Sequence, residues 1–410
     1  MIKPPTDRPA EAEHFRISVA KAEALIASHM PMAPAVQVRI EAAVQRVLRQ
    51  TITAERDQPP FNRATMDGIA IAGGDSSERQ FELAGTQAAG QARVKLPDNS
   101  CIEVMTGAVV PEGADTVIPV ERLHVEGTTA VIEDGYHYKQ GQFVHLGGSD
   151  HRQGTVLLEP GMTIGPPEMA VLASAGQRDV LVSENPAVAV VSTGDELVDV
   201  GEPITDSQIR SSNDRALAAA LQQAGLPRVS RHTFKDDAAQ LREGIAKLLQ
   251  ENDMLILSGG VSMGKYDYLP QVLHELGIEV VFHKITQRPG LPMWFGTSKA
   301  GQPVFALPGN PVSALVCLTR YVLPALGQSL QKVAQNEYVT LAEPLDFAAE
   351  LSWFVPVTVS YADDGRGMAK PKLTNTSGDF TALSGTTGFI ELPHEQSHFP
   401  LGYVARLFRW

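Results

Sequence analysis

Val-Ala-Val-Val-Ser-Thr-Gly-Asp-Glu at residues 188–196 and Met-Leu-Ile-Leu-Ser-Gly-Gly at residues 254–260 are the stretches that decide the fold. Each is a short apolar run followed by hydroxyl and glycine residues, and segments with helical periodicity follow both. Apolar strands that alternate with amphipathic helices predict a doubly wound, mostly parallel α/β domain, which binds ligands at the carboxyl ends of its strands. The expected strands are 188–192, 229–234, 254–257, 280–284 and 304–306, and the expected helices are 214–224, 238–249, 268–276 and 311–326.

The sequence on either side of this domain has a different texture. Apolar residues recur at helical spacing from about 15 to 48, which predicts helices there. Residues 51–145 are rich in glycine, proline and threonine and contain short β-type runs, which predict a small all-β module. A strand at 155–164 and a short helix at 167–175 follow. The segment from about 332 to 410 returns to β texture and predicts a small barrel-like domain.

Composition and charge restrict the class of protein. The chain has 410 residues, of which 43% are hydrophobic and 20% charged, as is typical of globular domains. Its 34 Lys and Arg and 47 Asp and Glu residues give a net charge of −13, which disfavours bulk binding to nucleic acid or anionic membranes. Two cysteines are too few for a disulfide framework or a cysteine-rich metal site. No signal peptide or membrane span is evident, so the cytoplasm is the expected location.

Two loops at expected strand ends have residues suited to phosphate and metal. Residues 192–196 offer hydroxyls and backbone N–H groups for a phosphate and Glu196 for a metal, although an N-capped turn would use the same residues. The loop 258–267 allows close approach of a phosphate to its backbone, or is a tight structural connection. Its residues of interest are Ser258, Gly259, Gly260, Ser262, Gly264 and Asp267, the last as a helix cap or a metal ligand.

Two more loops complete this edge of the expected sheet. Residues 284–290 place Lys284 and Arg288 near a strand end, and the alternative is a solvated loop with two unrelated cations. Residues 308–314 turn into a helix N-terminus, which favours anions, or form a simple turn. Because carboxyl ends of parallel strands meet at one edge, the loops together predict a site for a phosphorylated small molecule with Mg²⁺.

The β module has motifs of its own. Met66-Asp67-Gly68 opens it, and residues 105–115 lie further along. By themselves, Asp67 and Asp150 are typical of turns. His145 and His151 belong to no histidine metal-ligand motif and are interpreted as loop residues.

In this order, the motifs resemble the MoeA family, the molybdopterin molybdenumtransferases that also include the C-terminal part of gephyrin. The similarity is densest at 66–68, 105–119, 192–197, 208–213, 258–268 and 307–314. The resemblance implies an elongated subunit with a discontinuous linker and dimerisation domain (1–50 and 146–185) and an inserted β module (51–145). It further implies a molybdopterin-binding α/β domain (186–329) and a C-terminal β-barrel domain (330–410).

The resemblance also implies a reaction. Family members are homodimers whose active site lies between the α/β domain of one subunit and the inserted module of the other. They act on adenylylated molybdopterin with Mg²⁺ and release AMP as molybdate joins the dithiolene. For the dimer interface, the apolar positions of the N-terminal helical region are the expected surface.

The family's functional positions are carried over by motif. Catalytic roles are implied for Asp67, Thr106, Asp150, Glu196, Asp236 and Asp267, with Glu196 and Asp267 as metal ligands. Substrate contacts are implied for Ser192, Thr193, Gly194, Ser258, Gly259, Gly260, Ser262, Gly264, Lys284, Arg288, Pro308, Gly309, Asn310, Pro311 and Ser377.

The chain departs from the family pattern at three places. Leu291 stands where the family usually has lysine, Pro356 aligns with an arginine, and residues 62–65 differ from the usual Asp-Asn-Ser-Ala. The first two changes remove positive charge from the expected anion site. They favour the first alternative, a non-catalytic protein that holds molybdopterin or scaffolds partners. A second alternative is an adenylyltransferase or nucleotide hydrolase on the same α/β fold. Other proteins of molybdenum cofactor biosynthesis are further partners that the resemblance implies.

Overall fold

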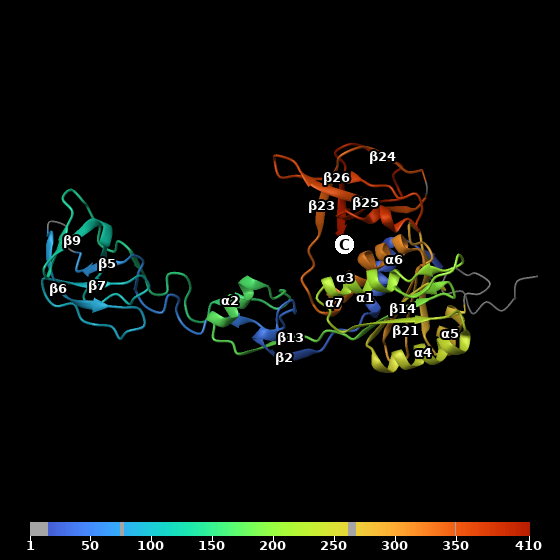
Figure 1. Ribbon diagram of the computed structural model, residues 1–410, viewed down its shortest axis with the longest axis horizontal. Helices are drawn as coiled ribbons and strands as arrows, with labels where there is room; N and C mark the ends of the chain where they lie inside the picture. The colour runs from blue at the N-terminus through green and yellow to red at the C-terminus, as the bar shows by residue number, and fades with distance from the viewer. Residues whose placement is uncertain (1–14, 74–77, 261–267, 349) are drawn as a thin grey trace, which may run out of the picture.

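The computed structural model describes residues 15–73, 78–260, 268–348 and 350–410. The subunit is elongated, with a small β module at one end, an α/β domain at the other end and a slender linker between them (Figure 1). A C-terminal barrel lies on one side of the α/β domain (Figure 1). None of the helices in the described residues is long and apolar enough to span a lipid bilayer.

A seven-stranded sheet forms the centre of the α/β domain; the sequence predicts five of its strands, and those at 15–17 and 294–297 are additional. Its strands, in order across the sheet, are β1 (Phe15–Ile17), β19 (Glu279–Ile285), β21 (Trp294–Thr297), β22 (Pro303–Leu307), β18 (Met254–Ser258), β14 (Val188–Thr193) and β17 (Val229–Phe234). Only β21 runs antiparallel to its neighbours. The carboxyl ends of β14, β18 and β22 therefore meet at one edge of the sheet.

Helices cover both faces of this sheet. The core on one face includes residues of α1 (Val19–His29), α3 (Asn213–Gln223), α6 (Pro311–Cys317) and α7 (Leu323–Ser329). The core on the other face includes residues of α4 (Ala238–Glu251) and α5 (Leu269–Glu275). The single helix expected at 311–326 is interrupted by a π-helical turn, η3 (Leu318–Val322), between α6 and α7.

The prediction of helices throughout residues 15–48 is wrong. Ser18 caps α1, but the chain then contains Pro31 and Pro34 and continues as β2 (Ala35–Arg39) and a 3₁₀ turn, η1 (Ile40–Ala42). Proline lacks a backbone N–H and disfavours helix interiors, and the alternation in Ala-Val-Gln-Val-Arg suits a strand. Furthermore, β1 pairs with β19 and the apolar face of α1 is buried against the α/β domain rather than in a linker domain.

The linker is built from short pieces of two distant chain segments. Strand β2 pairs with β13 (Asp179–Ser183), and β3 (Ile52–Thr53) pairs with β12 (Val156–Leu158). Helix α2 (Pro166–Ser174) packs beside them and matches the helix expected at 167–175. A small apolar core, which includes Leu48 and Leu172, holds these pieces together.

The inserted module is all-β, as expected. Its six-stranded sheet has the order β8 (Thr116–Pro119), β5 (Gly68–Ile71), β7 (Ser100–Val104), β6 (Gln80–Gln87), β10 (Thr129–Ile132) and β9 (Leu123–Glu126). A 3₁₀ turn, η2 (Val120–Arg122), links β8 to β9. Where the module joins the linker, β4 (Arg63–Ala64) pairs with β11 (Val144–His145).

The C-terminal domain is a closed barrel. Its strands are β23 (Glu337–Leu341), β25 (Ser352–Tyr361), β26 (Gly367–Pro371), β27 (Gly388–Leu392) and β29 (Val404–Arg409), and pairing of β25 with β27 closes the ring. Two short strands, β24 (Leu345–Asp346) and β28 (His398–Phe399), form a separate antiparallel pair. From the α/β domain, β20 (Gln287–Arg288) pairs with β25, and buried Arg320 bonds to Glu391 of β27. The multidomain α/β plus β architecture is thus confirmed.

Candidate functional site

The loops singled out in the sequence meet at the carboxyl edge of the seven-stranded sheet. Ser192 at the end of β14 lies opposite Ser258 at the end of β18, and Ser258 lies opposite Leu307 at the end of β22. The backbone N–H of Gly259 donates to the carbonyl oxygen of Leu307. Three loops that are far apart in the chain therefore form one surface, as predicted.

Glycine is required at position 259, where two of these loops touch. Gly259 has φ of +102°, and a Cβ there would lie 2.7 Å from the carbonyl oxygen of Thr193. A Cβ on Gly309 would lie 3.4 Å from the Cα of Gly259. The loops consequently pack backbone against backbone, which leaves N–H groups rather than side chains to line the surface.

Two buried hydroxyls lie at the end of β14. Ser192 and Thr193 are only 2% and 6% exposed. Within the described parts of the chain, neither Ser192 Oγ nor Thr193 Oγ1 has a hydrogen-bond partner. A buried hydroxyl without a partner costs free energy, so their retention at a sheet edge favours a ligand that bonds to them.

Asn213 joins two of the loops, a role that we did not predict from the sequence. Its amide Nδ2 donates to Ser258 Oγ at 2.8 Å and to the carbonyl oxygen of Gly309 at 2.8 Å. The sequence signal was the segment 208–213, which resembled a family motif without a stated role. Asn213 begins α3, and so this helix positions the amide.

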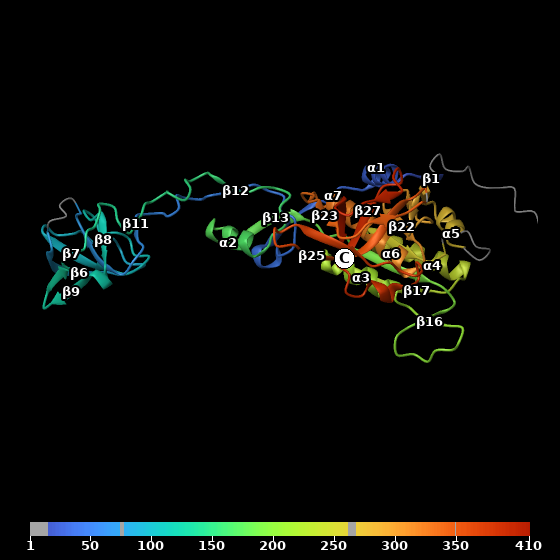
Figure 2. The same ribbon diagram turned by 90° about the horizontal axis from the view of Figure 1, so that it is seen from above.

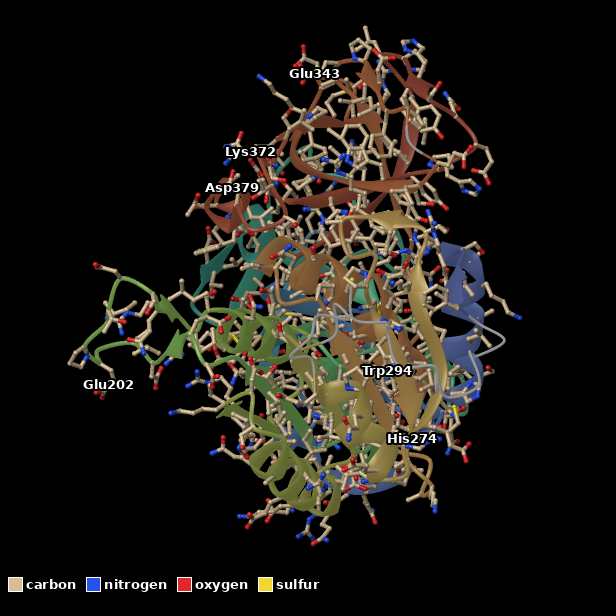
Figure 3. All side chains as sticks on the ribbon, turned by 90° about the vertical axis from the view of Figure 1, so that its right-hand side faces the viewer. Glu202, His274, Trp294, Glu343, Lys372 and Asp379 are labelled. Atoms are coloured by element: carbon tan, nitrogen blue, oxygen red, sulfur yellow. The ribbon has the colours of Figure 1, made fainter. Side chains whose placement is uncertain are left out.

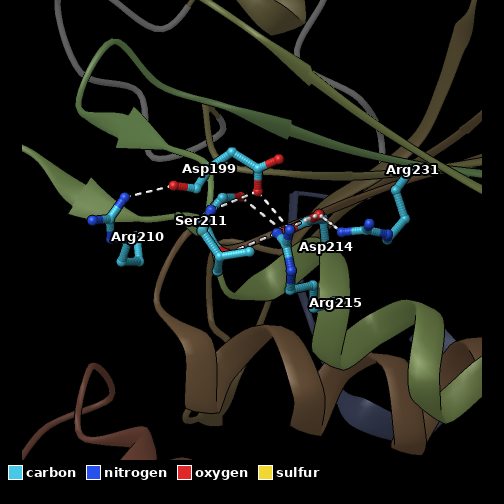
Figure 4. A network of polar contacts seen from close by, with 7 residues as sticks. Asp199, Arg210, Ser211, Asp214, Arg215 and Arg231 are labelled. Atoms are coloured by element: carbon cyan, nitrogen blue, oxygen red, sulfur yellow. Dashed lines mark hydrogen bonds and ion pairs between the residues drawn. The ribbon is translucent and has the colours of Figure 1, made fainter. Parts of the chain in front are cut away.

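A polar network fixes the chain segment that precedes α3 (Figure 4). Asp214 is 3% exposed and accepts hydrogen bonds from Ser211 Oγ at 2.8 Å and Arg231 Nη1 at 2.7 Å. Arg215 Nη2 donates to Asp199 Oδ1 at 2.5 Å. This network ties down the strand pair β15 (Leu197–Val198) and β16 (Ile209–Arg210), whose connecting loop projects from the domain (Figure 2).

The barrel contributes Ser377 to the same surface, as the resemblance implies. Asn310 Nδ2 donates to Ser377 Oγ at 2.6 Å, and the backbone N–H of Val312 donates to the carbonyl oxygen of Ser377. The loop that carries Ser377 continues into a 3₁₀ turn, η4 (Phe380–Leu383). Lys372 and Asp379, which flank Ser377 in the sequence, lie at the side of the barrel next to the α/β domain (Figure 3).

The remaining predicted groups of the α/β domain have separate surroundings. The carboxylate of Glu196 folds back over Gly194, where a Cβ would lie 2.6 Å from Glu196 Oε2. Asp195 Oδ1 accepts from the backbone N–H of Asp236 at 3.3 Å, so these acidic loops are neighbours. Ser262, Gly264 and Asp267 lie outside the described residues.

The two predicted cations are held by aromatic rings of different elements. Lys284 Nζ lies 4.9 Å from the ring centroid of Phe15 in β1. Arg288 Cζ lies 5.9 Å from the ring centroid of Phe347, next to the barrel strand that pairs with β20. Lys284 also has φ of +72°, a conformation that costs free energy for a residue with a Cβ.

A second group of predicted residues lies in the inserted module and its junction with the linker. Asp67 Oδ1 accepts from the backbone N–H of Thr106 at 2.6 Å and from Thr106 Oγ1 at 2.7 Å. These two bonds, the backbone one foremost, lower the pKa of the Asp67 carboxyl below its usual 3.8. Asp150 Oδ1 lies 2.8 Å from His145 Nε2. In Figure 1, this module and the sheet edge at β14 lie at opposite ends of the subunit.

Comparison with known proteins identifies the family. Residues 17–176 match the MoeA N-terminal region (domain I and II), and residues 189–328 match a probable molybdopterin binding domain. A molybdopterin molybdenumtransferase of Synechocystis sp. is 37% identical over 398 residues, which cover 96% of this chain and all of the relative. The chain belongs to the MoeA family.

Other members of the MoeA family support this assignment. A molybdopterin molybdenumtransferase of Staphylococcus aureus is 30% identical and covers 95% of this chain and 94% of its own. The crystal structure of a molybdopterin biosynthesis MoeA protein from Pyrococcus horikosii superposes with a TM-score of 0.78 at 29% identity, over 96% of this chain and 99% of that one. The agreement extends through all parts of the elongated subunit.

The departures from the MoeA pattern have different structural settings. Leu291 is half-buried, and its carbonyl oxygen accepts from the backbone N–H of Ile285 in the turn after β19. Pro356 is buried within β25, opposite Phe389, and its carbonyl oxygen accepts from the backbone N–H of Lys372. A cation is thus absent from position 356, but Lys372 lies on the neighbouring strand end.

Proposed function

We propose that this protein transfers molybdenum to molybdopterin in the biosynthesis of the molybdenum cofactor. Its substrates would be adenylylated molybdopterin and molybdate, and AMP would leave as molybdate joins the two dithiolene sulfurs. The observation that carries this proposal is the sheet edge where Ser192, Ser258, Gly259 and Gly309 meet around buried hydroxyls that have no partner among the described residues. The family membership supplies the reaction class.

The chain's own groups suit a phosphorylated pterin. Backbone N–H groups of glycine-rich loops bind phosphate oxygens, and the start of α6 adds a partial positive charge. Ser192 and Thr193 can donate to the same oxygens or to polar atoms of the pterin. The bonded pair Asn310 and Ser377 would border this pocket from the barrel side.

Mg²⁺ fits the chemistry of the donors at this edge. Magnesium prefers oxygen ligands and is commonly held by one or two carboxylates together with substrate phosphates. Glu196 would be one ligand, with Asp267 as the second, and Asp236 would remain a nearby carboxylate. The ion would offset negative charge on the phosphate oxygens of the substrate.

We further propose that the active site is completed by a second subunit. Asp67, Thr106 and Asp150 lie at the far end of the same chain from Ser192 and Ser258 (Figure 1). A homodimer would allow the inserted module of one subunit to reach the α/β domain of the other. Because the apolar face of α1 is already buried, the interface would use other parts of the elongated subunit.

The test is a turnover assay with purified protein. Adenylylated molybdopterin, Mg²⁺ and molybdate would be incubated with the protein, and AMP would be measured over time. Molybdate-dependent AMP release supports the proposal, and its absence despite pterin binding would refute the transferase. That outcome would favour the second candidate, a protein that holds or delivers molybdopterin. The lost cations at Leu291 and Pro356 are the observation that keeps this candidate open.

A further inference from the structure

Three side chains form a hydrogen-bonded row where the inserted module meets the linker. Arg63 and His145 are directly opposite each other in the β4–β11 pair. Arg63 Nη2 lies 3.1 Å and Nε lies 3.3 Å from His145 Nδ1. On the other side of the same imidazole ring, Nε2 lies 2.8 Å from Asp150 Oδ1. Both ring nitrogens are therefore engaged, each by a group with a fixed hydrogen-bonding role.

The chemistry of the row determines where the ring proton resides. A guanidinium has only N–H donors and keeps its charge at all relevant pH values, so Nδ1 must accept with its lone pair. The single proton of a neutral imidazole is then on Nε2, from which it is donated to the carboxylate of Asp150. We infer that Arg63 and His145 are positioning residues for Asp150, with His145 held as the Nε2–H tautomer.

Backbone hydrogen bonds hold this row in place. The N–H groups of Asp150 and His151 both donate to the carbonyl oxygen of Gln58, at 2.9 and 3.2 Å. Gly147 N donates to Asn62 Oδ1 at 2.8 Å, which fixes the loop between His145 and Asp150. With its backbone anchored and one oxygen bonded to His145, Asp150 has its second oxygen available in a defined direction.

The row is also connected to the other carboxylate of the module. Ala64, next to Arg63 in β4, exchanges backbone hydrogen bonds with the segment after Thr106: its N–H donates to the carbonyl oxygen of Ala108, and its carbonyl oxygen accepts from Gly107. Thr106 in turn bonds to Asp67. One short strand thus determines the placement of both Asp67 and Asp150.

The positioning row coincides with a departure from the family motif. Arg63 lies in the segment 62–65, which differs from the usual Asp-Asn-Ser-Ala. In this chain Arg63, at an exposed strand end, has His145 as its partner. The role of Asp150 in turnover rests on the proposed function, whereas the tautomer of His145 does not.

The first experiment measures the tautomer directly. Long-range ¹H–¹⁵N spectra of the histidine side chains at neutral pH distinguish Nε2–H, Nδ1–H and doubly protonated rings, and loss of a signal in His145→Gln assigns the residue. We expect Nε2–H for His145, and a population of Nδ1–H in Arg63→Leu. A wild-type ring that is protonated on Nδ1 overturns the inference. His398, which contacts Asp346 through Nδ1, is an internal reference with the opposite geometry.

The second experiment tests the effect on Asp150 through turnover. Glutamine at position 145 keeps an N–H near the place of Nε2, whereas the amide of asparagine is too short to reach it. We expect kcat to fall roughly tenfold in His145→Asn, with KM for the pterin unchanged, and to recover in His145→Gln. In an Asp150→Asn background, His145→Asn should cause no further loss.

Controls and outcomes separate this inference from the proposed function. His124 contacts Glu126 in the same module at 3.2 Å, and His124→Asn should leave AMP release unchanged. A full additional loss from His145→Asn in the Asp150→Asn background would overturn the positioning role. A wild type that releases no AMP would refute the proposed function alone, and the tautomer measurement would then decide the inference.

Discussion

The two groups of candidate residues differ in how they are built. At the carboxyl edge of the α/β sheet, Ser192 and Thr193 are almost fully buried, and glycines bring backbones into contact. Where the inserted module meets the linker, the side chains of His145 and Asp150 remain 29% and 48% exposed and are fixed by hydrogen bonds. The first group consists of buried hydroxyls and closely packed loops, and the second presents charge on a surface. The difference shows that an exposed carboxylate of the module can act on a ligand at the sheet edge only when the two surfaces are brought together.

The largest expected effect comes from placing defects in both groups. Asp67→Asn and Glu196→Gln should each lower AMP release at least about a hundredfold, because each removes a carboxylate with a proposed catalytic role. In the proposed homodimer, coexpression of the two variants would form mixed dimers in which one site is assembled from intact halves. About a quarter of wild-type activity should return, since about half of the dimers are mixed and half of their sites are intact.

The control for this complementation is the double variant in a single chain. Asp67→Asn with Glu196→Gln, coexpressed with itself, has no intact pair of halves in any arrangement. A mixture of single variants that is no more active than this control would show that the two groups do not share a site across subunits. Sedimentation of each preparation would establish whether dimers were present.

A smaller effect is expected from Asn213→Ala. This change removes both amide hydrogen bonds, to Ser258 Oγ and to the carbonyl oxygen of Gly309, which join two loops of the sheet edge. We expect the dissociation constant for molybdopterin to rise roughly tenfold, as for loss of one or two ordinary hydrogen bonds. Quenching of protein fluorescence on titration with the pterin would measure it.

Gln223→Ala provides a matched control on the same helix. Gln223 Nε2 donates to the carbonyl oxygen of Trp410 at 2.8 Å, so the control also removes an amide bond to a carbonyl. Its position at the end of α3, away from the start of the helix, predicts unchanged pterin affinity. Equal weakening in both variants would mean that Asn213 acts through the stability of α3 and not through the loops.

The sequence predicted the α/β sheet because its strands are short, apolar and buried on both faces, as at 188–192 and 254–257. It also predicted that the loops at 192–196, 258–267, 284–290 and 308–314 would share one edge, since parallel topology brings strand ends together. The described parts of the first, second and fourth loops do meet there. The prediction of helices over 15–48 holds only for 19–29, because Pro31 and Pro34 disfavour a continued helix and residues 35–39 alternate like a strand.

Other features depend on contacts that spacing cannot indicate. Asn213 joins two loops because α3 begins where Ser258 and Gly309 meet. His145 contacts Arg63 because β11 lies opposite β4. Both residues were visible in the sequence, but a lone asparagine or histidine is compatible with many turns. Pairings between distant segments determine these partners.

We expect a still smaller effect, on the molybdate requirement, from changing Leu291 to lysine. A lysine restored there would add a cation near the turn between Ile285 and Leu291, close to the strand end that carries Lys284. If this turn faces the oxyanion, the molybdate concentration for half-saturation should fall up to about tenfold, the effect of one hydrogen bond to a charged group. AMP release against molybdate concentration is the measurement. Leu401→Lys, on an exposed turn of the barrel, adds the same charge and should leave half-saturation unchanged.

The smallest effect concerns the acid limb of the pH profile. The backbone N–H and the hydroxyl of Thr106 lower the pKa of Asp67, so the carboxylate contributes stability that is present above pH 3.8 and is lost as pH falls through the lowered pKa. Thr106→Val removes the hydroxyl bond but keeps the backbone bond, which is the larger cause. The pKa of Asp67 should therefore rise only part of the way, and the decline of AMP release on acidification should move to higher pH.

Thr106→Ser retains both donors and should leave the profile unchanged. If the valine variant keeps the wild-type acid limb, the protonation of Asp67 does not govern activity there, and the group of residues in the module acts through shape and not through charge.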